Sequence, residues 1–570
     1  MRKLAIYTLI VFSWINSWAQ GQNDVTEINV TTKRTIETAF RFTENPKIID
    51  SIKPTQVIEY PLLVIQHPTK IILDTIKPAS IKIVDKLPQL YHSYVKLGIG
   101  SKLMPLGEVF FDGNRSRRYA YGVHAKHLSS FGDIKGYAPA QYDRTNVNLF
   151  GSINEKNYTL KGDLHYNNKG FQYYGIQNDS LSRDSITQRF SDIGGEFLYS
   201  SHKKDTGNLN YSIGLNYNNF QTKKPIIDSI AKWRATENFI GLAGSAIYKT
   251  GKEVYTADLN IRYNGYKYGI LDTGISIVDT GIVLNNTIIN IKPTITTFLK
   301  NNRFKARVGV DLTLDAHKQT KFYIYPIAEL KYSLLNDMFI PYVGLKGGLK
   351  QNTYKSISTE NEFVLPNIVM KNENTVIDAF FGLKGTLSKR ISFNASASFA
   401  SVKNKMLFIT DTLYSLRNKF NVDFDNGNIT TIEGSISYQL VEKLKIDAIG
   451  RYYSYAMSKN IYAWNLPQLQ VITRANYNLY DHFIFNLDLN FEGGRYGLVY
   501  AKEEDTKVEN NQIAKKLGLI SDINLSVEYR YNKRISAFIQ GNNLVGQRYK
   551  RWYNTPVQGI QVMGGITFRF

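Results

Sequence analysis

The sequence predicts an all-β fold: one large antiparallel β-barrel that crosses a membrane with its strands. Three observations support this prediction. From about His92 to Phe570, apolar and polar residues alternate with a period of two, in segments of ten or more residues. The chain has 39 Tyr and 30 Phe, and a transmembrane barrel needs such rings for the two aromatic girdles at its membrane interfaces. After the first residues, no segment has the roughly 20 apolar residues of a spanning helix, which leaves strands as the way to cross.

Residues 1–19 have the features of a cleavable secretory signal. Arg2 and Lys3 precede an apolar stretch, and Ser17-Trp18-Ala19 supplies the small residues of a cleavage site. We therefore expect a mature chain that begins at Gln20 and is exported to the outer membrane of a Gram-negative bacterium. N-terminal sequencing of the mature protein tests this expectation, and a retained Met1 would contradict it.

The alternation is clearest at 304–315, 483–492 and 519–532, where the polar row carries many charges. A soluble core cannot accept charges at every second position, whereas a water-filled lumen can, with the apolar row facing lipid. A soluble sandwich also alternates, but its strands are mostly around five or six residues long. These charges either set solute selectivity or form a network that stiffens the wall. The lumen-facing candidates are Lys305, Arg307, Asp311, Asp447, Arg451, Asp522, Glu528 and Arg530.

Short turns, most of them basic, alternate with mostly longer polar links. The short turns are Gly113–Arg117, Asn154–Lys156, His202–Asp205, Lys249–Lys252, Lys300–Arg303, Leu335–Asp337, Ser388–Arg390, Val441–Lys443, Tyr480–His482 and Asn532–Arg534. The longer links are 131–141, 168–186, 222–236, 268–280, 355–371, 404–427, 458–467, 503–516 and 548–557. Short turns belong to the periplasmic rim and long loops to the exterior. This order predicts about 22 strands, an even number with both ends of the barrel in the periplasm.

Composition excludes several other classes of protein. Without cysteine, the mature N-terminus cannot carry a lipoprotein anchor, and disulfides and thiolate metal sites are excluded. Removing the two basic residues of the signal lowers the formal net charge from +22 to +20. This excess is spread along the chain without a basic patch or nucleic-acid motif, so we expect no nucleic-acid partner.

No catalytic or metal-binding constellation is recognisable. His124 and His127 lie three apart on a predicted strand and point to opposite faces. No serine occupies a G-x-S-x-G elbow. Asp423, Asp425 and Gly427 depart from the spacing of a calcium loop, so we expect them in a solvated acidic loop. The sequence predicts no enzymatic activity, no cofactor and no metal site.

The predicted loops contain a set of aromatic residues. Exposed rings can bind sugars or protein partners, or they can belong to the outer girdle, and we favour the girdle. These residues are Phe171, Tyr173, Tyr174, Trp233, Trp464, Trp552 and Tyr553.

Residues 20–91 differ from the rest of the chain. Six of the fifteen prolines fall between Pro46 and Pro88, with short apolar pieces between them. Proline removes a ladder donor, so a regular central strand is excluded and an extended periplasmic segment is predicted. This segment is either a flexible tail, or it packs inside the barrel or adds a strand to a partner.

The C-terminal residues alternate up to Phe568 and Phe570, and this ending resembles the signal that the barrel assembly machinery reads in outer-membrane barrels. The ending GNNLVGQRYKRWYNTPVQGIQVMGGITFRF resembles the final hairpin of TonB-dependent receptors. The stretch HSYVKLGIGSKLMPLGEVFFDGNRSRRYAYGVHAKHLSS resembles the barrel start of receptor-like proteins common in Bacteroidota. The resemblance covers the barrel, residues 92–570.

The resemblance implies ligand import through a 22-stranded barrel that is filled by a plug domain and energised through a short TonB-binding box. The string Thr26-Glu27-Ile28-Asn29-Val30-Thr31 is similar to such a box. Residues 20–91 are too few for a standard plug and lack its mixed sheet-and-helix pattern. Because an empty barrel of this width would leak, we expect a lower strand count, or closure by this segment with inward loops, or closure by a partner.

The leading hypothesis is therefore a receptor-like barrel that acts in solute or ligand uptake, or as a barrel subunit of an envelope complex with TonB or a periplasmic or surface lipoprotein. A non-energised porin-like channel is the alternative.

Overall fold

The computed structural model describes residues 92–570, except 114–115, 179, 204–206, 224–225, 228–231, 271–280, 301, 414, 442 and 501–511. The predicted signal peptide, the TonB-box-like string and the Pro-rich segment all lie outside the described residues. No helix in the described part is long and apolar enough to cross a membrane.

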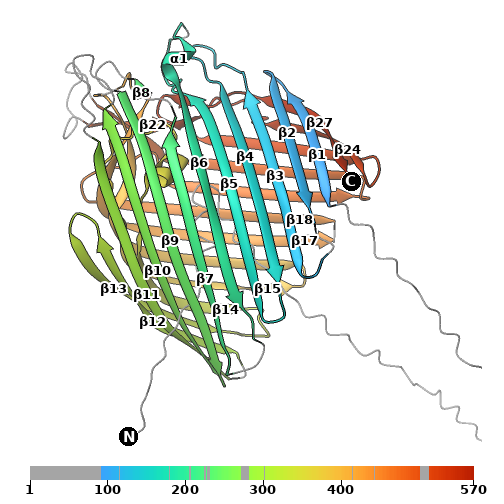
Figure 1. Ribbon diagram of the computed structural model, residues 1–570, viewed down its shortest axis with the longest axis vertical. Coiled ribbons are helices and arrows are strands. Elements are labelled where there is room, and N and C mark those ends of the chain that lie inside the picture. Colours follow the sequence, from blue (N-terminus) through green and yellow to red (C-terminus); the bar gives the residue numbers. More distant parts are fainter. Residues whose placement is uncertain are drawn as a thin grey trace, which may run out of the picture. The chain divides into compact units, whose positions relative to one another are not determined.

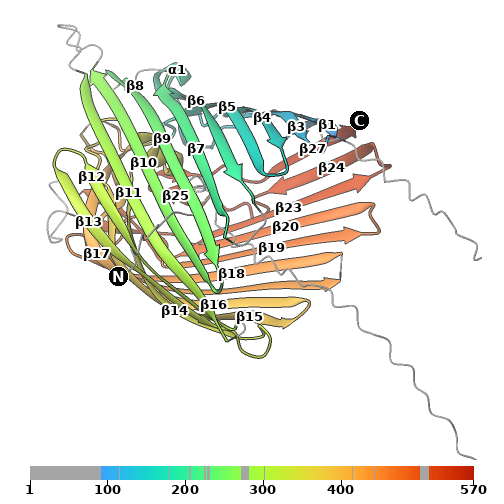
Figure 2. The ribbon, with the colours of Figure 1, turned by 60° about the horizontal axis from the view of Figure 1, so that its bottom comes forward.

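The described residues form a closed barrel of 22 antiparallel strands. One sheet contains 23 strands, of which the two-residue β8 only pairs with the first residues of β9, next to the ladder between β7 and β9. The barrel closes where β1 pairs with β27, from Tyr94 opposite Arg569 to Gly100 opposite Met563. Figures 1 and 2 show the strands following one another around the wall in chain order. The predicted fold class and strand number are confirmed.

The wall strands are β1 (Ser93–Gly100), β2 (Met104–Asp112), β3 (Tyr119–Ser130), β4 (Tyr142–Asn154), β5 (Tyr158–Gln172), β6 (Thr187–Ser201), β7 (Leu209–Thr222), β9 (Lys232–Thr250), β10 (Glu253–Ile270), β11 (Ile282–Leu299), β12 (Phe304–Ala316), β13 (Thr320–Tyr332), β14 (Ile340–Lys350), β15 (Glu373–Ser388), β16 (Ile391–Thr410), β17 (Phe420–Val441), β18 (Leu444–Met457), β19 (Leu469–Leu479), β20 (Phe483–Gly493), β23 (Ile520–Arg530), β24 (Ile535–Asn542) and β27 (Gln561–Arg569). The remaining elements are α1 (Arg183–Ile186), β8 (Ile226–Ile227), α2 (Tyr354–Glu360), β21 (Arg495–Tyr500), β22 (Gln512–Leu517), β25 (Lys550–Trp552) and β26 (Thr555–Pro556).

All ten predicted short turns fall where one wall strand ends and the next begins, at the rim that carries both ends of the barrel. In the turn between β19 and β20, Tyr480 and Asp481 both have positive φ angles, 53° and 58°. This conformation matches the twist of a tight hairpin. The long links are less accurate. The predicted link 404–427 is mostly strand, because β16 extends to Thr410 and β17 begins at Phe420.

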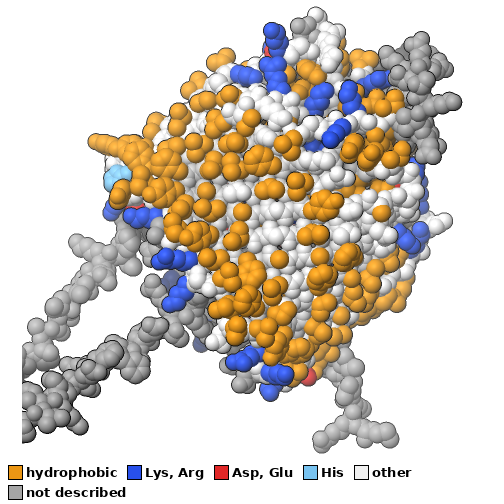
Figure 3. Space-filling view, turned by 180° about the vertical axis from the view of Figure 1, so that it is seen from behind, with side chains coloured by type: hydrophobic (Ala, Val, Ile, Leu, Met, Phe, Trp, Pro, Cys, Tyr) orange, Lys and Arg blue, Asp and Glu red, His pale blue; other side chains and the backbone are white. Residues whose placement is uncertain are grey.

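Alternation along each strand separates the two faces of the wall. On β12, Val308 is 60% exposed on the outer face, whereas Asp311 is 1% exposed on the inner face. Figure 3 shows apolar side chains spread over the outside of the wall and Lys and Arg side chains gathered toward its edges. This is the surface that lipid requires, with charges restricted to the rims.

Substitutions at Val527 and Glu528 on β23 test which side of the wall faces lipid. It lies between Phe485 of β20 and Ile539 of β24 in the strand register. Val527→Arg should destabilise the barrel by about 2–4 kcal/mol, because the charge would face the hydrocarbon core. Glu528→Gln should cost less than about 1 kcal/mol, because an amide keeps the volume and can still accept from Arg569. Urea titration of folding into vesicles measures both, and equal losses would contradict the register.

Candidate functional site: the lumen and its inward-folded loop

The connection between β14 and β15, residues 351–372, folds into the lumen. It begins with α2, whose N-terminus is closed by a capping box between Thr353 and Ser356. Tyr354 and Ile357 of α2 are fully buried. The loop therefore packs within the barrel, although the sequence predicted it only as a polar link.

Hydrogen bonds and an ion pair fix α2 to the inner wall. The carboxylate of Glu237 on β9 accepts from the backbone N–H of Tyr354 at 2.5 Å and of Lys355 at 3.2 Å. Lys355 Nζ lies 2.9 Å from Asp192 Oδ2 on β6. Burial lowers the pKa of Lys355, and the nearby carboxylates partly offset this effect. A carboxylate at a helix N-terminus and a buried ion pair are contacts that hold a helix in one place.

The later part of the loop reaches the far side of the lumen. Pro366 accepts a hydrogen bond from the Tyr266 hydroxyl of β10 at 2.5 Å. Glu362 forms an ion pair with Lys169 of β5. Strands β6, β7 and β9–β13 separate β5 from β14 along the wall. A loop that starts at β14 and contacts β5 must cross the interior.

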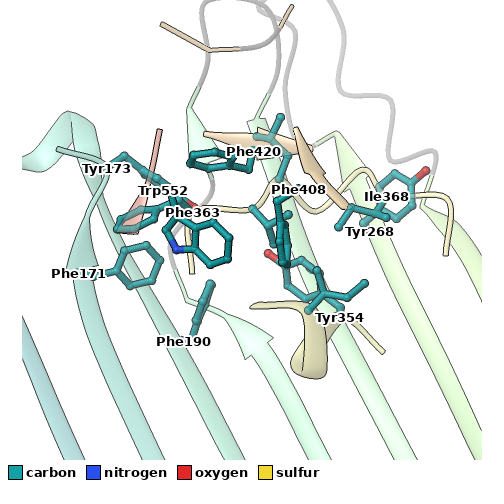
Figure 4. Packing of buried hydrophobic residues seen from close by; sticks show 14 of the residues in the cluster. Phe171, Tyr173, Phe190, Tyr268, Tyr354, Phe363, Ile368, Phe408, Phe420 and Trp552 are labelled. Atoms are coloured by element: carbon teal, nitrogen blue, oxygen red, sulfur yellow. The ribbon is translucent and has the colours of Figure 1, made fainter. Parts of the chain in front are cut away.

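An aromatic cluster joins this loop to the wall and to neighbouring loops (Figure 4). The Tyr354 ring stacks on Tyr266 at a centroid distance of 5.2 Å and also contacts Phe190 and Phe220. Phe363 meets Phe171 edge-on at 5.9 Å. Such pairs add stability beyond the apolar area that they bury.

Backbone hydrogen bonds connect the loops to one another. Phe420 donates to the Phe363 carbonyl at 2.9 Å and accepts from Leu365 at 2.8 Å. The Asn418 side chain donates to the Tyr173 carbonyl at 2.9 Å. The loops at this end of the barrel thus form one packed layer across the lumen.

The aromatic residues predicted as an outer girdle are partly misassigned. Phe171, Tyr173, Trp464 and Trp552 are buried, and three of them belong to the cluster inside the barrel. They come from loop or strand-end segments that turn inward. An aromatic residue in a loop can face the girdle or the lumen, so its presence alone did not give the direction.

The acidic residues Asp423 and Asp425 lie on β17, so the predicted solvated loop is wrong. Asp425 Oδ2 accepts from Asn460 N at 2.7 Å, and Lys459 Nζ lies 2.8 Å from Asp423 Oδ1. These contacts fix the loop after β18. Within the described residues, no group of three or more His, Asp or Glu side chains has the geometry of a metal site.

The predicted lumen-facing residues lie on β12, β18 and β23, at positions that alternate with exposed apolar residues. Asp311 pairs with Lys292 at 3.1 Å, Arg451 with Glu433 at 2.7 Å, and Glu528 with Arg569 at 2.8 Å.

The remaining members of the predicted set have weaker or more local contacts. Lys305 lies over the Phe298 ring, Asp447 accepts from Ser437, Asp522 accepts from Tyr549, and Arg530 lies near Glu528. Arg307 is half-buried opposite Glu329. The members are thus dispersed over three strands and meet no common centre.

The C-terminal candidates Phe568 and Phe570 are exposed on β27 and the last residue, with their rings stacked at 6.0 Å. Phe570 N donates to Ser93 O at 3.0 Å, where the barrel closes. Their proposed role as an assembly signal remains a prediction.

The residues that hold the loop, Glu237, Asp192 and Tyr354, were not among the sequence candidates. Two signals were present in the sequence. Thr353-x-x-Ser356 has the spacing of a capping box, and Phe363-Val364-Leu365 is an apolar run inside a polar link. An apolar run in a link indicates burial, although it does not say against which surface.

The Glu362–Lys169 ion pair should make docking of the loop dependent on pH. Burial raises the pKa of Glu362, but the charges of Lys169 and Arg144 outweigh burial and hold the pKa below its ordinary value. A carboxyl whose pKa is lower in the docked loop than in the undocked loop stabilises docking fully at pH values above the pKa of the undocked loop. This stabilisation is lost as the pH falls through the pKa of the docked loop. We expect the current through single barrels to rise on acidification. Glu362→Gln should remove this pH step and leave the current high throughout.

The geometry defines a class: a closed transmembrane barrel with a polar lumen and an internal layer of loops. No protein-family model matches the chain, and no curated protein matches it either. Solved structures do match. The chain has the barrel fold of TonB-dependent outer-membrane receptors.

The similar structures are named as transporters and receptors. The pyoverdine outer-membrane receptor FpvA of Pseudomonas aeruginosa PAO1, bound to pyoverdine, is 10% identical, with a TM-score of 0.62 over 85% of this chain and 79% of that chain. The copper transporter OprC is 14% identical, with a TM-score of 0.61 over 85% and 81%. The ferric-catecholate import receptor Fiu of E. coli K12 is 10% identical, with a TM-score of 0.59 over 85% and 82%.

Proposed function

We propose that this barrel takes up a small solute or ligand across the outer membrane, through a lumen whose passage is controlled by the loop 351–372. The observation that carries the proposal is the fixed crossing of the lumen by this loop, held by Glu237, Asp192 and Lys169. A barrel wall of this size needs an internal barrier, and a loop anchored by a few polar contacts can be released. The structural neighbours named as a copper transporter and a ferric-catecholate import receptor support this choice.

The N-terminal part of the proposal concerns residues outside the described range. We divide the chain into a signal peptide at 1–19, a Pro-rich periplasmic segment at 20–91 and the barrel at 92–570. We propose that residues 46–91 order against the barrel or a periplasmic partner and replace a standard plug, because a barrel of this width needs closure and these residues join the first strand directly. The string Thr26–Thr31 is the proposed contact with TonB.

Solute uptake by whole cells tests the energised form of the function. A strain that expresses the barrel should lose uptake when TonB is removed or when residues 26–31 are deleted. Uptake that persists in both strains, together with steady single-channel conductance of the purified protein, would instead support the porin-like channel. The charged inner wall is the observation that favours this alternative.

A role as barrel subunit of an envelope complex has a separate test. Pull-down from native membranes should then recover a periplasmic or surface lipoprotein in fixed proportion to the barrel. Deleting residues 22–85 should abolish that recovery if the segment is the docking element.

A further inference from the structure

A cavity of about 560 Å³ lies against the inner wall beside α2. Residues of β10, β11 and β14 form its sides, and Lys355, Ser356 and Thr359 of α2 border it. The opposite face of α2, with Tyr354 and Ile357, packs into the aromatic cluster. The helix thus separates an apolar layer from a polar cavity, which has the size of a small-molecule site.

The lining of this cavity is strongly cationic. Three lysines are paired: Lys292 with Asp311 at 3.1 Å, Lys346 with Asp378 at 3.4 Å, and Lys355 with Asp192 at 2.9 Å. The Glu237 carboxylate accepts hydrogen bonds from the backbone N–H groups of Tyr354 and Lys355 in α2. The full charged lining consists of Arg262, Lys292, Lys346, Lys350 and Lys355 against Glu237 and Asp378.

Arg262 and Lys350 have no ion-pair partner within the described part of the chain. Arg262 Nε is buried without a hydrogen-bond partner, and one Nη donates weakly to the Leu349 carbonyl at 3.4 Å. A guanidinium offers five N–H donors, and leaving them unsatisfied inside a protein costs free energy. A carboxylate or phosphate matches the fork of this side chain with two parallel hydrogen bonds.

Two buried acceptors on the same lining also lack donors. They are Asn290 Oδ1 and Gln351 Oε1. Both oxygens have almost no exposed surface, so the class of ligand is set by the cationic groups of Arg262 and Lys350 and not by these amides. Small carboxylates and phosphates match these cationic groups.

We propose that this cavity binds a small anion, with its carboxylate or phosphate on Arg262 and Lys350. This inference rests on the proposed uptake function, since it names the substrate class that the lumen would select. Cationic side chains lining a narrow passage favour anions. Because α2 borders the cavity, a bound anion also contacts the loop that crosses the lumen.

Isothermal titration of the full mature protein in detergent tests the site. The probes are citrate, glucose 6-phosphate, inorganic phosphate and, as the neutral reference, glucose. We expect binding of citrate or glucose 6-phosphate and none of glucose. Arg262→Gln should weaken binding roughly tenfold or more, as expected for a charge-assisted pair. Lys350→Gln should weaken it less, and Arg262→Lys should restore part of the loss.

Arg474→Gln is the matched control, because Arg474 lies on β19 outside the cavity, 3.4 Å from Asp488. The electrophoretic shift on heating shows that each variant is folded.

Binding of citrate alone identifies a carboxylate site, whereas binding of both glucose 6-phosphate and inorganic phosphate identifies a phosphate site. The proposal is overturned if no probe binds or if Arg262→Gln and Arg474→Gln weaken binding equally. If a probe binds at this cavity but cells take up no solute, the result contradicts the proposed uptake function and still supports the binding site.

Discussion

Replacing residues 353–371 by an equal number of Gly and Ser residues should convert the barrel into an open pore. The replacement removes the capped helix that positions the backbone N–H donors for Glu237, the Lys355–Asp192 pair and the buried rings of Tyr354 and Phe363. The wall strands keep their hydrogen-bonded ladders, so the barrel should still fold. Cells should become sensitive to antibiotics too large for ordinary porins, and single-channel conductance should rise on the order of tenfold or more.

A second variant, in which residues 22–85 are deleted, is measured alongside the loop replacement to separate the contributions of the Pro-rich segment and of the loop. If the loop alone closes the lumen, this deletion leaves permeability unchanged and the loop replacement opens the barrel. If both are needed, only the double variant is fully open. Antibiotic entry after the deletion, with no effect of the loop replacement, would refute the role of the loop and assign closure to the Pro-rich segment.

The wall of the barrel was predictable because lipid and water impose opposite demands on neighbouring residues. The alternation of Val308 and Asp311, or of Val527 and Glu528, determines which face each occupies. The ten short turns were equally readable, since the alternation is interrupted by a few basic or polar residues at each of them.

The interior of the lumen was not predictable in the same way. Glu237 and Arg262 occupy inward-facing positions in the alternation, like many other polar residues of the wall. The sequence around them does not indicate that they contact residues about 90 to 120 positions later in the chain. Docking of residues 351–372 depends on contacts with β6, β9 and β10, which only the closed barrel brings together. A link of polar residues with one apolar run is compatible with an exposed loop and with an inward one.

The extent of the long strands was also missed. Residues 404–427 contain Asp423, Asp425 and several asparagines, which favour loops in water. In the structure these carboxylates accept from the loop after β18, and the strand continues through them. Polar side chains on the inner face satisfy one another, so composition alone understates strand length.

Tyr354→Ala should undock α2 without unfolding the barrel. Tyr354 is fully buried among Phe190, Phe220 and Tyr266, and truncating such a ring costs about 3–5 kcal/mol. Amide hydrogen exchange in residues 355–365 should accelerate roughly 10²- to 10³-fold, while exchange in the wall strands stays slow.

Tyr342→Ala is the control for loss of an aromatic ring elsewhere on the wall. Tyr342 lies on β14 outside the aromatic cluster and donates to Asn394 Oδ1 at 2.7 Å. It should leave the exchange of residues 355–365 unchanged. Equal acceleration in both variants would mean that the loop responds to the wall as a whole and has no docking site of its own.

Tyr354→Phe sharpens this test, because the Tyr354 hydroxyl is buried and has no hydrogen-bond partner among the described residues. A buried hydroxyl without a partner costs desolvation free energy, so its removal should leave docking unchanged or tighten it. Exchange at 355–365 should then be as slow as in the natural chain or slower. Faster exchange in Tyr354→Phe would show that the hydroxyl, and not the ring, holds α2 in the lumen.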